Sequence, residues 1–260
     1  MYAAGLKVES AKGECNLGQH EIAFRYEDVL RSCDNHVIYK NAAKELAVQH
    51  GQSITFMAKY DQREGNSCHI HLSLRGQDGS AVFADKRRKN GQSKLFGHFL
   101  AGVQATMREF SYFYAPNINS YKRFQHGSFA PTAIAWGRDN RTCALRVVGQ
   151  GHGLRMENRV PGGDVNPYLA VGAMLAGGLH GIEHELRPEP EFVGNAYNAD
   201  LDHVPTTLAE ARDLLDRSAI ARACFGDDVV DHYVNAATIE VGAFNAAVTD
   251  WERIRGFERL

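Results

Sequence analysis

Two short segments of this sequence alternate between apolar and polar residues, with Asn158 the one polar residue at an apolar position. In residues 68–75 the polar positions read His-x-His-x-Ser-x-Arg, and in residues 154–160 they read Arg-x-Glu-x-Arg. Successive side chains of a β-strand point to opposite faces, so this alternation predicts two strands with one apolar and one polar face each. Polar faces of this composition are typical of strands that border a solvent-filled cleft.

The rest of the chain mixes helical and strand patterns. Helices are predicted at residues 26–49, 93–114, 168–185 and 228–251, with a further one opened by a capping box at residues 207–210. Further strands are predicted at residues 54–59, 132–136 and 142–148. This order predicts one α+β domain with a mainly antiparallel sheet backed by helices.

Composition narrows the classes of function. The 260 residues carry a formal net charge of −2, which favours neither nucleic acid nor an anionic membrane surface as a partner. No apolar run reaches the length of about 18 residues that a membrane span needs, and no secretory signal pattern opens the chain. The five cysteines lack C-x-x-C spacing, which indicates reduced thiols. We therefore expect a cytoplasmic protein.

The two polar strand faces, taken together, predict metal and phosphate chemistry. Carboxylates and imidazoles can bind Mg²⁺ or Mn²⁺, and guanidinium groups bind phosphate and carboxylate oxygens in pairs. Taken alone, His69 and His71 are more typical of a solvent-facing strand, and among metals zinc would fit them as well. Taken alone, Arg155, Glu157 and Arg159 are more typical of a cross-strand ladder of ion pairs than of a catalytic site.

Five motifs in order resemble the catalytic motifs of glutamine synthetases. They are Glu14-Cys-Asn-Leu-Gly-Gln-His-Glu21-Ile, Cys68-His-Ile-His-Leu-Ser-Leu, Asn119-Ser-Tyr-Lys-Arg123, Trp136-Gly-Arg-Asp-Asn-Arg141, and Arg155-Met-Glu-Asn-Arg159 followed by Asn166-Pro-Tyr. The resemblance covers residues 1–260 and implies the fold of that family's catalytic domain, with a curved, mainly antiparallel sheet.

The resemblance also implies roles for individual residues. The metal ligands would be Glu14 and Glu21 for one cation, and His69 with Glu157 for the other. Positions near the nucleotide would be Glu9, Tyr26, His71 and Ser73. The arginines that neutralise the transferred phosphate would be Arg141, Arg146 and Arg155. The glutamate site would contain Arg123, Arg159, Glu64 and Gly65, and the arginines with a catalytic role would be Arg123, Arg141 and Arg159.

The implied reaction is an ATP-dependent ligation that needs Mg²⁺ or Mn²⁺. The γ-carboxylate of glutamate attacks the terminal phosphate of ATP, and an amine then displaces phosphate to give an amide. In ammonia-using members a glutamate closes over the ammonium site, whereas here the loop reads Gly127-Ser128-Phe129-Ala130-Pro131. Phe129 and the substituted Glu64 resemble the branch that makes γ-glutamylpolyamines and γ-glutamylamides, so we expect a polyamine or alkyl amine as co-substrate.

Nothing in residues 1–260 resembles the family's N-terminal β-grasp domain or its Glu-x-Glu motif. We therefore expect a partial catalytic domain whose full-length form assembles as a homo-oligomeric ring. Three alternatives stay open: a glutamine synthetase that uses ammonia, a non-catalytic relative with a structural or regulatory role, and a metal-dependent hydrolase built on the His-x-His strand.

Overall fold

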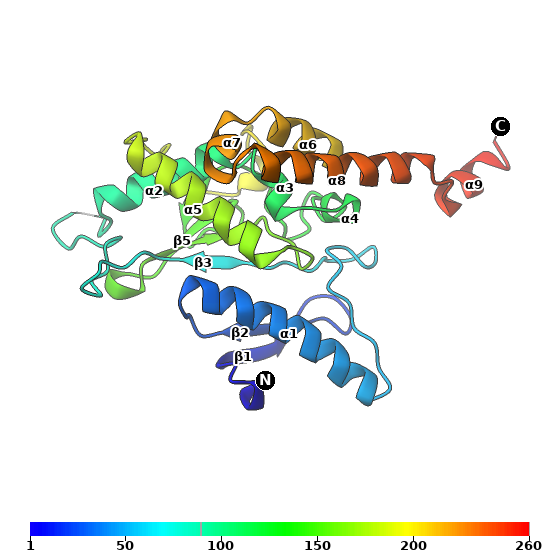
Figure 1. Cartoon of the computed structure of the whole chain (residues 1–260), viewed down its shortest axis with the longest axis horizontal. Helices are drawn as coiled ribbons and strands as arrows, with labels where there is room; N and C mark the ends of the chain where they lie inside the picture. Colours follow the sequence, from blue (N-terminus) through cyan, green and yellow to red (C-terminus); the bar gives the residue numbers. More distant parts are fainter. Residues whose placement is uncertain (89, 260) are drawn as a thin grey trace.

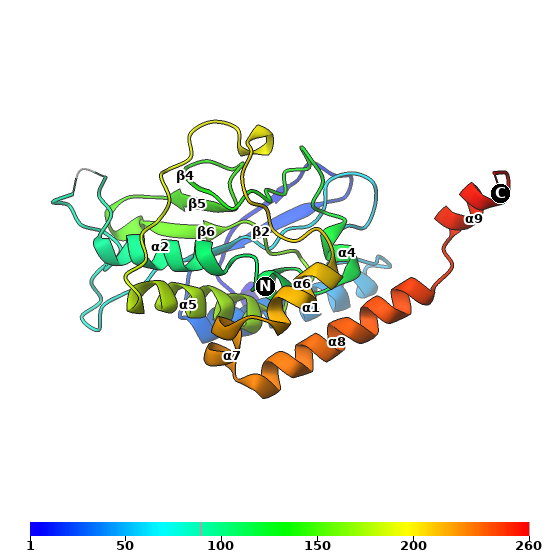
Figure 2. The same ribbon diagram turned by 90° about the horizontal axis from the view of Figure 1, so that it is seen from above.

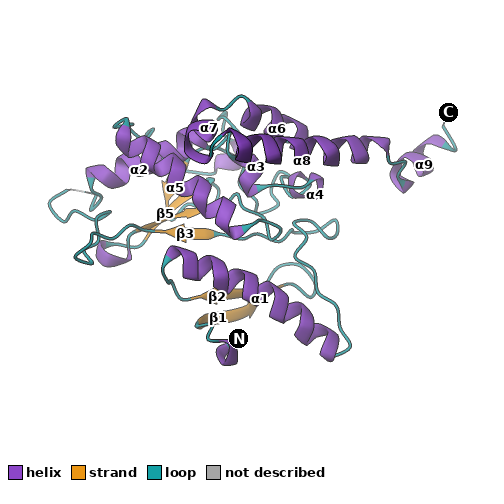
Figure 3. Ribbon diagram, in the orientation of Figure 1, coloured by secondary structure: helices purple, strands orange, loops and turns teal. Residues whose placement is uncertain are grey.

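The chain folds around a small mixed sheet with helices on one side and a separate hairpin on the other (Figures 1 and 3). This computed structural model describes residues 1–88 and 90–259. In chain order its strands and α-helices are β1 (Val8–Gly13), β2 (His20–Phe24), α1 (Val29–Gln49), β3 (Ile70–Leu72), α2 (Lys94–Thr106), α3 (Ser111–Tyr114), α4 (Ile118–Tyr121), β4 (Trp136–Arg138), β5 (Leu145–Val148), β6 (Arg155–Asn158), α5 (Pro167–Glu183), α6 (Leu208–Asp216), α7 (Ala219–Phe225), α8 (Asp227–Ala246) and α9 (Asp250–Gly256).

The main sheet has the strand order β3-β6-β5-β4. β6 pairs antiparallel with both β3 and β5, while β4 and β5 run parallel. The predicted α+β class and mainly antiparallel sheet are therefore confirmed. Because β6 is an inner strand, its side chains have a neighbour on each side, and this determines where the polar face is built.

Helices α2 and α5 cover the apolar face of the sheet by packing very closely against each other. Their contact is made by glycines: a Cβ atom on Gly181 would lie 2.6 Å from the Cα of Gly102 and would overlap the carbonyl oxygen of His98. Such an approach is possible only where both helices lack side chains. The aromatic core below them includes Phe96 and Phe99, both fully buried.

The β1–β2 hairpin and α1 form a separate layer beside this body (Figure 1). Side chains join the hairpin loop to the segment before β3: Asn16 Nδ2 donates to Asp61 Oδ1 at 2.8 Å, and Gln19 Nε2 donates to the Gly65 carbonyl at 2.9 Å. Helix α1 is joined to α5 by the Tyr168 hydroxyl, which donates to Asp34 at 2.5 Å. The hairpin itself was not predicted from the sequence.

Residues 54–59 do not form the predicted strand. Their backbone groups do not pair with a neighbouring strand. The amide and the carbonyl of Lys59 bond to the Asn119 side-chain amide at 2.9 and 2.8 Å. The carbonyl of Met57 accepts from the Asn66 side chain, and the carbonyl of Ala58 accepts from the Asn66 backbone amide. Asn119 thereby anchors this segment to α4. The predicted strand at 132–136 is also displaced, since β4 begins only at Trp136.

Two predicted helices are each divided in the structure. Residues 93–114 form α2 and α3, and the hydroxyl of Ser111 bonds to the carbonyl of Met107 at the break. Residues 228–251 form most of α8 and the start of α9, because Thr249 and Glu252 make a capping box that starts a new helix. Helix α8 extends beyond the body and carries α9 at its far end (Figure 2). Within the part of the chain that the structure describes, no helix is long and apolar enough to cross a membrane.

The glycine contact between α2 and α5 can be tested by two alanine substitutions in the same helix. Gly181→Ala forces a Cβ into the backbone of α2, so it should lower the free energy of unfolding by about 1–3 kcal/mol. Gly172→Ala meets only a ring carbon of Phe225 at 3.6 Å and should raise it by about 0.5–1 kcal/mol through helix propensity. Urea unfolding of both variants measures the difference, and equal effects would contradict the close-contact account.

Candidate active site

The carboxylate of Glu157 lies at the centre of the polar face. The strand register places His71 of β3 and Arg146 of β5 directly opposite Glu157 of β6, one on each side. Arg159 Nη1 lies 2.7 Å from Glu157 Oε1, and Arg146 Nη1 lies 3.0 Å from Oε2. One carboxylate therefore holds two guanidinium groups, each on its own oxygen.

This arrangement is shielded from solvent. Glu157 is 2% exposed and Arg159 7% exposed, so their charges interact more strongly than a surface pair would. Burial lowers the pKa of Arg159, although Glu157 opposes the shift. For Arg146, burial also lowers the pKa, but bonds to Asp139 and Glu157 outweigh it and the net shift is upward. Both arginines are available as cations for phosphate or carboxylate oxygens.

His69, just before β3, and His71, within β3, are kept neutral beside this carboxylate. Burial, followed by the charge of Arg159, holds the pKa of His69 well below its usual value. Burial likewise lowers the pKa of His71, and Arg155 Nε donates to His71 Nδ1 at 3.1 Å. His69 Nδ1 lies 3.4 Å from Glu157 Oε1, while its Nε2 is buried without a hydrogen-bond partner.

These features fit a divalent cation. A neutral imidazole with a free ring nitrogen next to a carboxylate offers two suitable ligands. Across residues 1–88 and 90–259, however, His, Cys, Asp and Glu side chains do not form a group of three that could hold a metal ion. His69 and Glu157 would therefore supply only part of a coordination shell.

Arg123 is buried beside the same face, with 1% of its surface exposed. Its Nη1 donates to Ser67 Oγ at 2.9 Å, its Nη2 donates to the carbonyl of Val160, and burial lowers its pKa to about 10. Gly65 is required here, because a Cβ at this position would lie 2.7 Å from the Arg123 Cγ. The predicted pairing of Gly65 with Arg123 in one site is thus consistent with their contact.

The remaining predicted residues of this face lie at its edges. Arg155 also donates from Nη1 to the Gly153 carbonyl at 3.0 Å, and Ser73 is exposed just beyond β3. Arg141 is exposed in the turn between β4 and β5. Glu64 is half-buried in the segment that the hairpin contacts through Asn16.

The hairpin carries the other predicted ligands on a separate element. Glu14 and Glu21 both pair with the ammonium of Lys12, at 2.9 and 3.5 Å, so a cation already lies between the two carboxylates. The bond to Lys12 lowers the pKa of Glu14. Glu9 is exposed on β1, and Tyr26 follows β2 with 89% of its surface exposed.

The loop after Arg123 presents Phe129 to solvent. Phe129 is 61% exposed and has a φ of 59°, in the left-handed region that non-glycine residues seldom occupy. The Ser128 hydroxyl donates to the Arg123 carbonyl at 2.9 Å and so fixes the loop close to the buried arginine.

Two charged residues of this region were missed by sequence reasoning. Asp139 accepts from Arg146 Nε at 3.0 Å, and Lys12 bridges the hairpin carboxylates. Asp139 lies inside the quoted 136–141 motif, and Lys12 stands two residues before Glu14, on the same face of an extended segment. The signal for each is an opposite charge near a predicted site residue: Asp139 for Arg146, and Lys12 for Glu14.

A sheet face of arginines around one carboxylate, with a neutral histidine beside it, defines a site for phosphate and carboxylate groups. The chain matches the family described as glutamine synthetase, catalytic domain, over residues 1–255. The chain therefore belongs to the glutamine synthetase family, and the matched residues correspond to the catalytic domain of that family.

Three known proteins are similar to this chain over nearly its whole length. A gamma-glutamylethanolamide synthetase of Streptomyces coelicolor is 64% identical over 100% of this chain and 56% of its own length. A glutamate–isopropylamine ligase of a Pseudomonas species is 40% identical over 98% of this chain and 57% of its own length. A solved GmaS/ADP complex superimposes with a TM-score of 0.92 at 29% identity, covering 99% of this chain and 61% of that one. The chain thus spans little more than half the length of these curated relatives.

The central role of Glu157 can be tested by removing its charge. Glu157→Gln leaves Arg146 and Arg159 buried without a counter-charge, so the free energy of unfolding should fall by about 3–5 kcal/mol. The matched control is Asp213→Asn, which weakens the more exposed Arg212–Asp213 pair and should cost about 0–1 kcal/mol. Denaturant unfolding of both variants gives the comparison, and similar small losses would show that the buried arginines do not depend on Glu157.

Proposed function

We propose that the protein containing this chain is an ATP-dependent ligase that joins the γ-carboxylate of glutamate to a small organic amine. The observation that carries the proposal is the buried Glu157 with Arg146 and Arg159 on its two oxygens and neutral His69 beside it. The similarity to two relatives named as γ-glutamylamide-forming enzymes supports the same reaction class.

In this proposal the arginines divide between the two anionic substrates. Arg123 and Arg159, on the side of the face near Ser67, bind glutamate together with Glu64 and Gly65. Charge on the transferred phosphate is neutralised by Arg141, Arg146 and Arg155, while the nucleotide lies near Glu9, Tyr26, His71 and Ser73. Fixed positive groups of this kind are what phosphoryl transfer requires.

The proposed reaction has two chemical steps. An oxygen of the glutamate γ-carboxylate bonds to the terminal phosphorus of ATP as the bond to ADP breaks. The neutral amine nitrogen then bonds to the γ-carbonyl carbon, phosphate leaves with the carboxylate oxygen, and the nitrogen loses a proton. The buried guanidinium groups stabilise the negative charge that develops in each step.

Mg²⁺ or Mn²⁺ would be held by His69 with Glu157, and by Glu14 with Glu21. A cation at these positions brings the phosphate oxygens and the glutamate carboxylate together by neutralising their charge. At the hairpin it would compete with the Lys12 ammonium, which lies between the two carboxylates.

An organic amine fits the 127–131 loop better than ammonium does. A carboxylate over the amine site would stabilise an ammonium ion, whereas Phe129 offers an aromatic surface without charge. The two relatives act on ethanolamine and isopropylamine according to their names, so these amines are the first to test. Ammonia remains the second candidate co-substrate, and a homo-oligomeric ring is the proposed assembly.

Phosphate release from ATP, with glutamate and Mg²⁺ present, tests this function. We expect release to require both glutamate and an amine. The kcat/KM for ethanolamine or isopropylamine should be at least about tenfold above that for ammonium, which corresponds to a free-energy difference of about 1.4 kcal/mol. The assay should use this chain and the chain extended by any upstream coding sequence. Release without glutamate would favour a hydrolase, and a preference for ammonium would favour glutamine synthesis.

Phe129→Glu tests the amine preference directly. The new carboxylate should lower the ratio of kcat/KM for isopropylamine to that for ammonium by up to about fivefold, because one added ion pair at an exposed position contributes up to about 1 kcal/mol. Phe244→Glu, at a partly exposed position on α8, is the matched control and should leave the ratio unchanged. An unchanged ratio in Phe129→Glu would exclude this residue from amine selection.

A further inference from the structure

Arg146 is held by two carboxylates, and only one of them, Glu157, has a role in the proposed function. Arg146 Nη1 lies 3.0 Å from Glu157 Oε2. Its Nε donates to Asp139 Oδ1 at 3.0 Å, and its Nη2 donates to the same oxygen. Glu157 is buried, whereas the side chain of Asp139 is 79% exposed. An exposed carboxylate usually forms only a weak ion pair, so the geometry of this one decides whether it does more.

The two carboxylates leave part of the Arg146 guanidinium free for a ligand. A guanidinium carries five N–H groups. Hydrogen bonds to the described residues use three of them, one each on Nε, Nη1 and Nη2. One N–H therefore remains on each of the two terminal nitrogens, and such a pair can bind two oxygens of one phosphate. The Arg146 side chain is still 15% exposed, which leaves surface for that contact.

The backbone of Asp139 restricts which residues can stand there. Its φ is 48°, in the left-handed region that Asp, Asn and Gly adopt more readily than other residues. Its amide donates to the carbonyl of Val147 at 3.0 Å, which joins the end of β4 to β5 next to Arg146. The carboxylate therefore reaches the guanidinium from a defined position.

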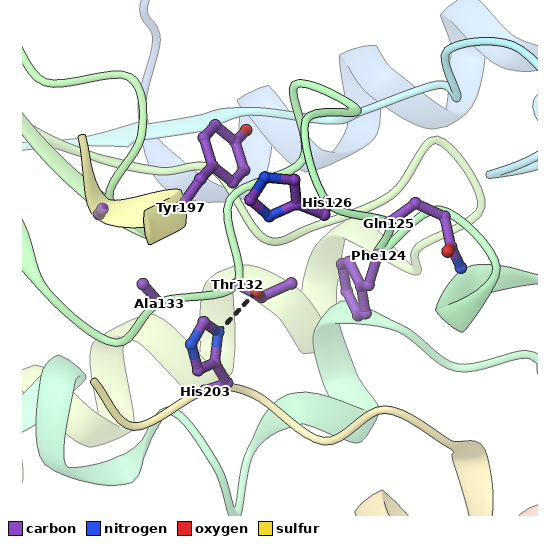
Figure 4. Close-up of a pocket in the computed structure, with 8 residues that line it drawn as sticks. Phe124, Gln125, His126, Thr132, Ala133, Tyr197 and His203 are labelled. Atoms are coloured by element: carbon purple, nitrogen blue, oxygen red, sulfur yellow. Dashed lines mark hydrogen bonds between the residues drawn. The ribbon is translucent and has the colours of Figure 1, made fainter. Parts of the chain in front are cut away.

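The turn after β4 is also fixed by the loop before α6. Asn140 Nδ2 donates to the Gly194 carbonyl at 3.0 Å, and the Ala196 amide donates to Thr142 Oγ1 at 2.9 Å. Ala196 is fully buried, and Tyr197 after it lines a cavity of the body (Figure 4). The turn is therefore attached to β5 on one side and to an anchored loop on the other.

A carboxylate at this place has an electrostatic disadvantage. Hydrogen bonding from Arg146, followed by the charge of Arg146, lowers the pKa of Asp139, so the carboxylate stays ionised and repels a phosphate. Exposure reduces this repulsion, because water and salt screen a charge at the surface. The two hydrogen bonds to Arg146 still define a direction, and phosphoryl transfer depends on groups that are already oriented. Orientation is therefore the contribution that Asp139 can make.

We propose that Asp139 is a positioning residue, which fixes the guanidinium of Arg146 so that its two remaining N–H groups face the transferred phosphate. Asp139 acts through Arg146 and does not itself touch the substrates. This inference rests on the proposed ligase function and adds to it a residue outside the predicted site.

Asp139→Gly separates orientation from stability, because glycine adopts a positive φ without strain. The thermal unfolding midpoint should therefore not fall. We expect kcat to fall by roughly tenfold or more, because a misdirected guanidinium stabilises the transition state less. The KM for ATP should not rise, since a negative charge has been removed. Both constants come from phosphate release with glutamate, Mg²⁺ and ethanolamine, on the chain extended by any upstream coding sequence.

Two further variants test the route through Arg146. Asp139→Asn keeps an acceptor oxygen without its charge, so its kcat should lie between those of the unmodified protein and Asp139→Gly. It carries the test if Asp139→Gly does not fold. Arg146→Ala should reduce kcat, and adding Asp139→Gly to it should reduce kcat no further, because two residues that act as one unit are not additive.

Asp213→Ala is the matched control. Asp213 Oδ1 accepts from Nε and Nη2 of Arg212 at 2.8 and 2.7 Å, the same pattern of contacts on α6. Its loss should leave kcat and the KM for ATP unchanged.

The outcomes distinguish this proposal from the ligase function itself. An unchanged kcat in Asp139→Gly would make the pair with Arg146 an ordinary surface ion pair, and a higher kcat would mean that Asp139 only opposes the phosphate. Either result, or a further fall in the double variant, overturns the positioning role and keeps the ligase. If the unmodified protein shows no release that requires glutamate and an amine, the ligase and the positioning role are both overturned.

Discussion

The polar face of this domain depends on the ion pairs between Glu157 and two arginines that come from different segments of the sheet. Arg146 and Arg159 could not lie so close together inside a protein without a carboxylate between them, because like charges repel strongly where water is excluded. β6 places that carboxylate on an inner strand, so β3 and β5 can each add polar side chains beside it. The same charge that stabilises the arrangement also keeps two guanidinium groups oriented for phosphate and carboxylate ligands.

Helices α2 and α5 support the sheet on the side opposite the polar face, and a second group of carboxylates lies on the β1–β2 hairpin. Close glycine contacts between α2 and α5 allow a dense aromatic core under the sheet, which fixes the strands that carry the site. Glu14 and Glu21 lie on the β1–β2 hairpin, which is joined to the body through Asn16 and Gln19. The two-cation site that we propose would need both the sheet face and the hairpin.

Much of the fold and part of the site could be predicted because they depend on local patterns. Period-two alternation identified β3 and β6 and the side of each that carries His71 and Glu157, and the ordered motifs identified the family. The predictions that were wrong concern segments whose hydrogen-bond partners are distant in the sequence. Residues 54–59 have a strand-like composition, yet their backbone bonds to Asn119 and Asn66, which no local pattern reveals. The cavity lined by residues 124–126, 132–133, 196–197 and 203 likewise joins segments about seventy residues apart. The roles of the individual site residues remain predictions.

The most direct test of the central claim follows an oxygen atom. Glutamate labelled with ¹⁸O in its γ-carboxylate is turned over with ATP, Mg²⁺ and ethanolamine, and the released phosphate is analysed by mass spectrometry. If the γ-carboxylate attacks the terminal phosphate on the Glu157–arginine face, each phosphate should carry one ¹⁸O atom from glutamate. Phosphate without the label would show that ATP is cleaved by water and would contradict the account.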